Sequence, residues 1–383
     1  MLSSELIVDA RALDGLRSEW DELAVACALP LMAPATVMSW WRHLAPANAE
    51  PRSVAVRDGK KLIGLAPFYV TPEERQRVDY RLPGIELAAR LSPLAAPGRE
   101  WEVAGEVAQV LATAHPRPDL IALEGHPVAS QWPAALRDSW PGALRPPLRQ
   151  YVTQGAPTVS LGQPTFEGWL SGKSANFRSQ MRRMRRQFVA DGGVARVSTE
   201  DKIAADIDTF MRLHAARWEK RGRSGIVAMG KKYSATIHEI SRSHLQDGRF
   251  RLWILELQGT PISAQLFISA GSEVAYINGG WDERFAHLKP AILGILYAIE
   301  DAFAHSLERM DLGAGALPYK QRLADGSDPV AWNILVVPGS RLPLTVIRTA
   351  PMLARSALRD KAKRALSVQQ AERLRDLRDK LTR

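Results

Sequence analysis

The chain has 383 residues, 46% of them hydrophobic and 24% charged, which is enough for two or three globular domains with their own cores. Its formal net charge of +10 favours anionic partners, such as a nucleotide cofactor, nucleic acid, lipid headgroups or an acidic sugar. Cys27 is the only cysteine, which excludes an internal disulfide, a cysteine-based zinc site and an iron–sulfur cluster.

The first half alternates short strands and helices, which predicts a mixed α/β domain. Asp58 and Gly59 form a turn signal between two of the strands. The predicted strands are Glu5 to Val8, Ser53 to Arg57, Leu62 to Val70 and Leu120 to Glu124, and the predicted helices are Leu13 to Ala26, Val37 to Leu44, Val103 to Ala114 and Trp132 to Trp140.

A basic helix is predicted from Ser174 to Ala190, ending at Gly192 and Gly193. Apolar residues at positions 177, 181, 184 and 188 form one face. The other faces carry Arg178, Arg182, Arg183, Arg185 and Arg186. Such a cluster repels itself, so it favours an anion or an acidic surface as partner, with Arg178, Arg182 and Arg186 as substrate contacts. The alternative is that carboxylates elsewhere in the fold pair with these arginines.

The second half predicts three antiparallel strands, then a long helix, then a further strand. The strands are Arg251 to Leu257, Pro261 to Ser269, Glu273 to Asn278 and Met310 to Gly313. The helix begins near Pro290, which suits a first helical turn. Two helices, Ser174 to Ala190 and Asp201 to Lys220, precede this β-β-β-α-β order.

Over half of the net charge lies in the last 29 residues, Arg355 to Arg383, which hold ten basic and four acidic residues. The leucines from position 353 onward are spaced as in an amphipathic helix, with a break near Ser367. They are Leu353, Leu358, Leu366, Leu374, Leu377 and Leu381. The helix either docks by these leucines with a solvated charged face, or attaches to a membrane surface or a protein partner.

The order of these elements resembles the GNAT acyltransferase fold, and more closely its branch related to the CelD cellulose-biosynthesis proteins and the Fem peptidyltransferases. The residues that carry the resemblance are the arginine-rich helix, Leu213-His214-x-x-Arg217-Trp218, Tyr276 to Asp282, and Asp311-x-Gly313 followed by Pro318-Tyr319-Lys320.

The resemblance covers residues 157 to 324 well and the first half in outline, where Fem-type proteins carry a partial second copy of the fold. It implies an α/β (α+β) chain of two GNAT-like halves, each a mixed, mainly antiparallel sheet flanked by helices. We expect domains at 1–156 and 157–340, and a basic helical tail at 341–383.

The resemblance also implies acyl-CoA, as acetyl-CoA or a longer thioester, as co-substrate. Amide groups at the start of a helix bind phosphate because they lack intrahelical partners. The candidates are Ala291, Ile292 and Leu293, with Lys289 and Gly294 beside them. The family's loop is usually richer in glycine, and an ordinary helix start is the alternative. Pantetheine would lie between the strands at 274–278 and 309–313, near Asn278.

Acyl transfer to an amine needs a base for the amine proton and an acid for the departing thiolate. Asp282 and Glu256 are candidate bases and Tyr319 is the candidate acid. The alternatives are a helix-entry cap for Asp282 and a solvent-facing strand position for Glu256. Lys320 contacts an acyl or phosphate group in the family-based interpretation, and is otherwise a surface lysine.

His214 shares a helical face with Ile207, Phe210 and Trp218, which is typical of a hydrogen-bonded core histidine. The resemblance places it on the acceptor side, as a catalytic residue. It likewise assigns Trp218, Glu256, Gln265 and Asp311 to substrate binding. No metal site is expected from the eight scattered histidines, and a Gly-x-Ser-x-Gly nucleophile motif is absent.

The favoured function is an N-acyltransferase that moves an acyl group from acyl-CoA to an amine, such as an amino sugar or an envelope or exopolysaccharide metabolite. One alternative is a Fem-like transferase with an aminoacyl-tRNA donor, although no inserted coiled-coil hairpin supports nucleic-acid binding. Another is a non-catalytic binding protein of a polysaccharide-synthesis or membrane assembly. The N-terminal residues lack a signal-peptide pattern and no apolar run approaches ~20 residues, so we expect a cytoplasmic protein, free or at the inner membrane face.

Overall fold

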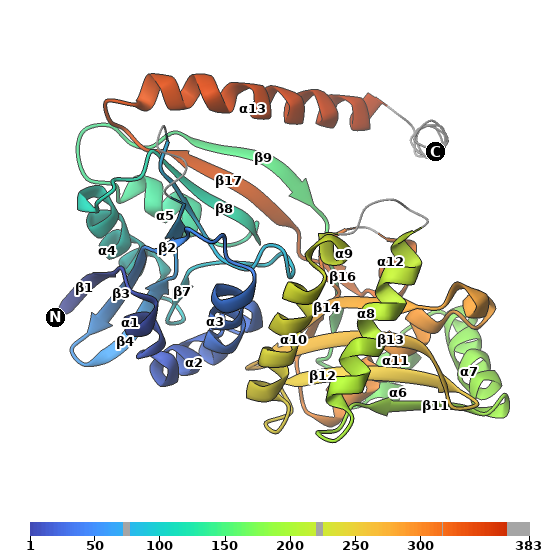
Figure 1. Ribbon diagram of the computed structural model, residues 1–383. Coiled ribbons are helices and arrows are strands. Elements are labelled where there is room, and N and C mark those ends of the chain that lie inside the picture. Colours follow the sequence, from blue (N-terminus) through green and yellow to red (C-terminus); the bar gives the residue numbers. More distant parts are fainter. Residues whose placement is uncertain (72–76, 220–224, 316, 366–383) are drawn as a thin grey trace.

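The computed structural model describes residues 1–71, 77–219, 225–315 and 317–365. Two α/β halves lie side by side, and a long C-terminal helix runs along the outside (Figure 1). None of the helices in these ranges is long and apolar enough to cross a membrane.

The first half contains two sheets. The chain crosses from one sheet to the other between residues 51 and 53, and again between residues 66 and 69. The four-stranded sheet has the order β1 (Leu2–Ile7), β3 (Ser53–Asp58), β4 (Lys61–Ala66), β7 (Leu94–Ala95). The six-stranded sheet has the order β2 (Glu50–Pro51), β5 (Tyr69–Val70), β6 (Asp79–Arg81), β8 (Leu120–Pro127), β17 (Val330–Val336), β9 (Leu148–Gln154).

The helices of the first half pack on these sheets around buried tryptophans, among them Trp20, Trp132 and Trp140. They are α1 (Ala10–Asp14), α2 (Arg17–Ala26), η1 (Pro30–Met32), α3 (Pro34–His43), α4 (Glu100–Thr113) and α5 (Trp132–Asp138). The single helix predicted over Leu13 to Ala26 is wrong, because α1 ends at Asp14 with Gly15 as its C-cap, and α2 begins at Arg17. The turn at Gly59 is confirmed, with φ +58°.

The second half is built on a seven-stranded sheet. Its order is β11 (Gly193–Val197), β12 (Phe250–Leu257), β13 (Thr260–Ala270), β14 (Glu273–Trp281), β15 (Arg309–Asp311), β10 (Pro157–Ser160), β16 (Gly326–Ser327). The antiparallel β12-β13-β14 meander and the parallel β14–β15 pair confirm the predicted β-β-β-α-β order.

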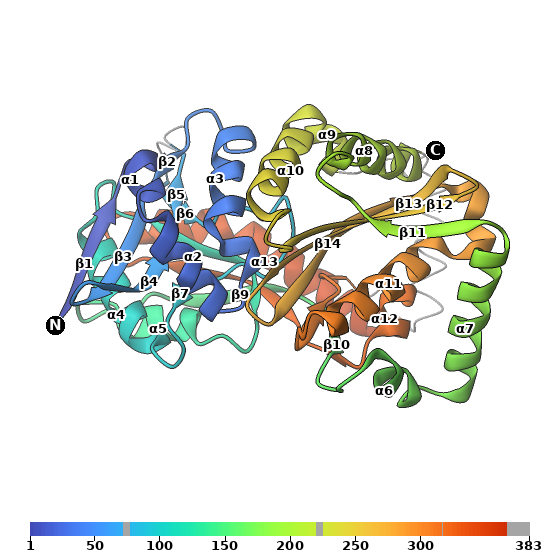
Figure 2. The same cartoon turned by 90° about the horizontal axis from the view of Figure 1, so that it is seen from below.

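Helices cover both faces of this sheet (Figure 2). One face carries α8 (Ile203–Glu219), α9 (Gly225–Met229) and α10 (Lys231–His244). The other carries α6 (Phe166–Ser171), α7 (Ala175–Ala190), α11 (Pro290–Ala304) and α12 (Pro318–Leu323), and η2 (Glu283–Leu288) leads into α11. The helix start expected at Ser174 is confirmed, since its hydroxyl accepts from the amide of Phe177 and caps α7.

The two halves share a strand and several contacts. β17 follows the whole second-half sheet in sequence, yet it pairs with β8 and β9 of the first half. Helix α10 packs on α3, and His43 Nε2 lies 2.8 Å from Glu239 Oε2 between them. The domain ranges 1–156, 157–340 and 341–383 stay predictions. Strand β17 lies within the range 157–340, yet it belongs to the six-stranded sheet of the first half.

The C-terminal helix α13 (Leu342–Ala365) lies along β9 and β17. Leu353 packs on the cluster of Leu120, Ile334 and Val336, whereas Leu358 is 66% exposed. The prediction that both leucines belong to one docking stripe is therefore wrong, because positions five apart point to different sides of a helix. The other leucines of that stripe, and the break at Ser367, lie outside the described residues.

Candidate active site

The second-half sheet opens between β14 and β15. Their parallel pairing runs from Glu273–Arg309 to Ala275–Asp311 and stops there, while β14 continues to Trp281. Residues 276 to 278 consequently have β13 on one side and no strand on the other. The opening expected between the strands at 274–278 and 309–313 is present.

A pocket of about 180 Å³ lies at this opening, between the two halves. Its walls come from the end of α8, β14, the loop before α12, and a loop of the first half. The lining residues are Ala88, Ala89, Arg217, Tyr276, Ile277, Asn278, Gly313, Ala314, Leu317, Tyr319 and Lys320. Of the predicted site residues, the pocket thus brings together Asn278, Tyr319 and Lys320. Two lining side chains are basic and none is acidic.

Lys320 is held inside the pocket wall. It is only 7% exposed, and its Nζ lies 3.5 Å from Gly313 O and 5.4 Å from the ring centre of Tyr276. Burial lowers the pKa of Lys320 to about 8, with the nearby Asp311 opposing and Arg217 reinforcing the shift. The surface-lysine alternative is therefore wrong, and Lys320 carries its proton on most molecules at neutral pH.

A chain of polar side chains forms the base of the pocket. Tyr276 donates its hydroxyl to Gln265 Oε1 at 2.8 Å, and Gln265 Nε2 donates to Ser263 Oγ at 2.8 Å. Tyr319 interacts with both Tyr276 and Arg217, and burial raises its pKa. Gln265 is fully buried, so it supports Tyr276 instead of contacting a substrate directly. Both phenols stay protonated at neutral pH and act as hydrogen-bond donors.

A loop of the first half closes one side of the pocket. Ala88 and Ala89 line it, and the next residue, Arg90, donates its amide to Gly125 O at 2.6 Å. The buried Arg90 guanidinium reaches the other half, with Nε 2.5 Å from Asp311 Oδ2 and Nη1 2.8 Å from Asp328 Oδ2. Asp311 also accepts the amide of Gly313 at 2.8 Å. Asp311 is therefore an anchor of the pocket wall, and its role as a substrate contact stays a prediction.

His214 lies behind β14 and does not line the pocket. It is 2% exposed, and because a carbonyl only accepts, its Nδ1 donates to Gly279 O at 3.2 Å. Burial lowers the pKa of His214, so the ring is neutral at pH 7. The structure thus places it as a buried link between α8 and β14. Trp218 follows on α8, and its side chain lies outside the described residues.

The two carboxylates predicted as bases are engaged elsewhere. Asp282 caps η2 through the amide of Arg284 and pairs with its guanidinium at 2.6 Å, which lowers the pKa of Asp282. Glu256 pairs with Arg196 at 2.7 Å on the far side of the meander. The helix-entry cap considered for Asp282 is present, whereas Glu256 is a half-buried, paired strand residue and not the solvent-facing one considered for it. Neither residue lines the pocket, and their assignments to catalysis and substrate binding stay predictions.

The start of α11 offers a smaller phosphate cradle than expected. Leu293 already donates its amide to Lys289 O at 3.1 Å, which leaves Ala291 and Ile292 because Pro290 has no N–H. Gly294 faces the sheet, where an added Cβ would lie 2.8 Å from Gln265 Cγ, so its role is close packing. The exposed Lys289 starts the helix in a left-handed conformation at φ +52°. None of these residues lines the pocket.

The arginines of α7 lie beside β11, three strands from β14 (Figure 2). Arg178 donates to two carbonyl oxygens, of Ser171 and Lys173, and Arg182 pairs with Glu167 at 3.0 Å. Arg185 pairs with Glu300 at 2.6 Å. Partners within the fold hold Arg178 and Arg182, and the structure does not bring Arg178, Arg182 or Arg186 to this pocket. Their assignment to substrate binding stays a prediction.

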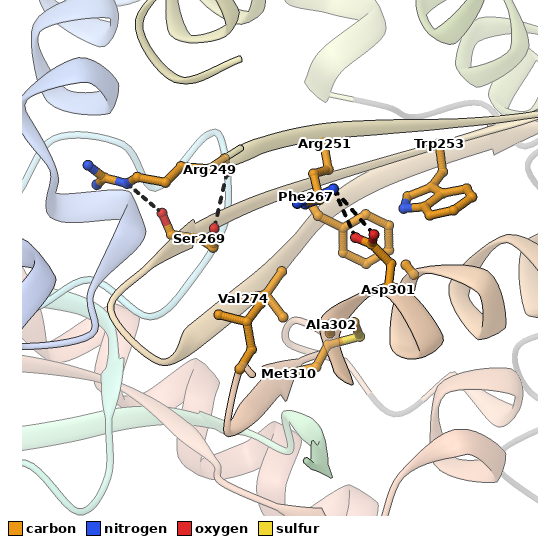
Figure 3. A pocket seen from close by; sticks show the side chains of 11 residues that line it. Arg249, Arg251, Trp253, Phe267, Ser269, Val274, Asp301, Ala302 and Met310 are labelled. Carbon is orange, nitrogen blue, oxygen red and sulfur yellow. Dashed lines mark hydrogen bonds and ion pairs between the residues drawn. The ribbon is translucent and has the colours of Figure 1, made fainter. Parts of the chain in front are cut away.

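Another gap in the second half is too small for a substrate. Figure 3 shows this gap between β12, β13 and α11, bordered by the ion pair of Arg251 and Asp301, and its volume of about 10 Å³ holds at most one water molecule. Within the described ranges, no three His, Cys, Asp or Glu side chains are placed to hold a metal ion.

Some pocket residues were not predicted as site residues. Arg217 and Tyr276 belong to sequence segments that carry the resemblance to the GNAT fold. Their place in those segments was the signal that could have identified them as site residues. Ala88, Ala89 and Arg90 had none, because two alanines in a proline-rich region carry no recognisable chemistry, and Arg90 contacts Asp311 and Asp328 at 221 and 238 positions away in the chain.

Comparison with known proteins identifies the second half. Residues 175–321 match the model of the acetyltransferase (GNAT) domain. This range contains α7, the meander, α11 and Lys320, so the second half carries a GNAT domain, and the chain has two GNAT-like halves. No curated protein matches the sequence.

Solved structures share the fold over nearly the whole chain. One titled FemX has a TM-score of 0.61 at 12% identity and covers 90% of this chain and 99% of its own. The C-terminal domain of a putative lysylphosphatidylglycerol synthetase from Agrobacterium fabrum has a TM-score of 0.52 at 10% identity, over 87% of this chain and 95% of its own. L-PGS from Bacillus licheniformis has a TM-score of 0.50 at 10% identity, over 84% and 96%. These likenesses concern the fold, and the finer CelD-like branch stays a prediction.

Proposed function

We propose that the protein is an N-acyltransferase that transfers an acyl group from acyl-CoA to an amine in the pocket between its halves. The observation that carries the proposal is the opening of β14 from β15 with Lys320 in its wall. Residues 276 to 278 lack a strand partner on that side, so their backbone groups are available to the amides of pantetheine. The GNAT domain of the second half supports acyl transfer as the reaction class.

The reaction forms a C–N bond and breaks a C–S bond. The amine attacks the thioester carbonyl, its oxygen gains negative charge, and the tetrahedral intermediate expels the thiolate, which takes the proton lost by the amine. The ammonium of Lys320 stabilises the negative oxygen, and Tyr319 donates a hydrogen bond to it or to the thiolate. Among the described residues that line the pocket none is acidic, and we assign the amine proton to water or the departing sulfur.

Binding of the donor is tested by thermal unfolding with acetyl-, medium-chain and long-chain CoA. A donor at 100 times its dissociation constant adds about 2.7 kcal/mol of stability. Lys320→Met should lower kcat about 100-fold or more, with the exposed Lys202→Met as matched control. Unchanged melting temperatures with every thioester, or normal turnover in Lys320→Met, would refute the proposal.

The acceptor we propose is an amino sugar or another amine of envelope or exopolysaccharide metabolism, as the family resemblance implies. An aminoacyl-tRNA donor is the second candidate, and one observation favours it. Arg183 and Arg186 are exposed on α7 and make no contact with a carboxylate among the described residues. Tight tRNA binding that falls steeply with salt and is lost in Arg183→Gln/Arg186→Gln would select this donor. Binding that these changes leave unaltered would exclude it.

A further inference from the structure

Helix α13 carries apolar side chains on the side that faces away from the protein. A surface helix of a globular protein normally buries its apolar stripe and exposes polar residues. In α13 the buried positions include Thr345, Thr349 and Ser356. The hydroxyl of Thr349 donates to Thr345 O at 2.9 Å, which satisfies it within the helix.

Five of the exposed apolar residues of α13 form one continuous outer stripe. Its members recur at intervals of three and four residues, which keeps them on one helical face. They are Leu344, Ile347, Pro351, Ala354 and Leu358, all exposed. Ile347 is 68% exposed and Leu358 is 66% exposed, among the largest values for apolar side chains of the described chain. Figure 1 shows no labelled element on this side of α13.

Positive charge accompanies the outer stripe. The sequence from Leu342 to Ala365 contains six basic residues and one acidic residue. Arg355 precedes Leu358 by three residues and is exposed, as is Lys361. A second copy of this helix laid against the stripe would bring like charges together. An anionic lipid surface accepts the apolar stripe between its acyl chains and neutralises the basic residues at its headgroups.

We propose that the outer stripe of α13 binds membrane surfaces that contain anionic lipid. The helix lies in the surface plane and does not cross the bilayer. This binding is independent of the acyl-transfer proposal, because α13 contributes no residue to the pocket between the halves.

The test measures co-sedimentation of the full chain with vesicles of phosphatidylcholine, with and without phosphatidylglycerol. We expect binding to the anionic vesicles that weakens as salt is raised. Ile347→Gln/Leu358→Gln should lower the partition coefficient at least tenfold. The matched control is Val189→Gln/Val194→Gln, which changes two valines that are 61% and 54% exposed on the other half and should leave binding unchanged.

A second variant tests the charges without touching the stripe. Arg355→Gln/Lys361→Gln should lower the partition coefficient for anionic vesicles roughly fivefold per charge and leave phosphatidylcholine binding unaltered. Equal binding to both vesicle types, or equal loss in the valine control, would overturn the proposal. So would a change from dimer to monomer in Ile347→Gln/Leu358→Gln without vesicle binding, since it would assign the stripe to a second copy.

Discussion

A single lysine shows how burial changes the chemistry of a residue that is ordinarily a surface charge. Lys320 lines the pocket, and its ammonium group lies against the ring of Tyr276 and the carbonyl oxygen of Gly313. Gly313 has φ +78°, and an added Cβ would lie 3.4 Å from Lys320 Nζ, so glycine suits this position in both respects. The lowered pKa follows from this enclosure.

The lowered pKa makes stability depend on pH. The folded protein releases the Lys320 proton near pH 8, whereas the unfolded chain holds it up to the ordinary lysine pKa of 10.5. The unfolded state therefore binds more protons within this window, and the free energy of unfolding contributed by Lys320 rises with pH by at most about 1.4 kcal/mol per pH unit. Below pH 8 the contribution is constant and unfavourable.

We predict that Lys320→Met removes this rise. Urea unfolding at several pH values between 8 and 10.5 measures it, as the difference between wild type and variant. The Lys202→Met control should retain the wild-type profile. Parallel profiles for wild type and Lys320→Met would show that the lysine is not buried as described.

Under the acyl-transfer proposal, the acting form of Lys320 is its ammonium. The turnover of the wild type should then fall as pH rises through about 8, where Lys320 loses its proton. Lys320→Arg keeps the positive charge across this range, so its residual activity should lack that fall. A wild-type rate that increases through pH 8 would instead identify the neutral lysine as a base. Initial rates at saturating donor decide between these outcomes.

Helix α8 and strand β14 approach each other more closely than side chains allow. At Gly280 an added Cβ would lie 2.3 Å from the His214 amide nitrogen and 2.5 Å from Leu213 C. These are backbone atoms of a helix, so they cannot move independently. Gly280 therefore lets α8 lie against β14, with His214 within reach of the Gly279 carbonyl.

We predict that Gly280→Ala lowers the free energy of unfolding by about 3 kcal/mol, because the methyl group forces α8 away from the sheet. Denaturant unfolding gives the value. Gly162→Ala is the control, since its Cβ would meet only Ser160 Oγ at 3.7 Å, and we expect a change within about 0.5 kcal/mol. A similar small change in Gly280→Ala would contradict the close approach.

The two halves form one molecule through a buried charge cluster as well as through β17. Arg90 of the first half contacts Asp311 and Asp328 of the second, and Arg309 pairs with Glu273 at 2.6 Å and with Asp328 at 2.8 Å. Burial raises the pKa of Glu273 to about 7 despite the two arginines. The cluster is thus balanced closely enough that losing one guanidinium leaves uncompensated buried charge.

We predict that Arg90→Met lowers the free energy of unfolding by about 3–5 kcal/mol and weakens donor binding, because Ala88 and Ala89 lose the anchor that holds them at the pocket. Arg90→Lys keeps the positive charge but loses the planar set of guanidinium N–H donors. Its free energy of unfolding and its donor affinity should therefore lie between those of wild type and Arg90→Met. Equilibrium unfolding and the thermal shift with CoA thioesters are the measurements. Full stability in Arg90→Met would show that the halves do not depend on this contact.

The sequence by itself determined the element order of the second half. Hydrophobic periodicity, turn glycines and Pro290 are local signals, and they specify helices and strands independently of how distant elements pack. It also predicted the opening beside β14 and three pocket residues, through a resemblance in element order. It did not show which partners hold Asp282, Glu256, Asp311 and the α7 arginines, since only spatial neighbours show whether a charged side chain is already paired.

Tertiary structure alone decided which parts of the chain meet. Arg90 and Asp311 are 221 positions apart, and β17 enters a sheet whose neighbouring strands end at residues 127 and 154. The direction in which α13 presents Leu353 and Leu358 depends on where the helix docks, and its own periodicity does not specify that. A local pattern determines which residues share a face, whereas the packing of distant elements determines what that face contacts.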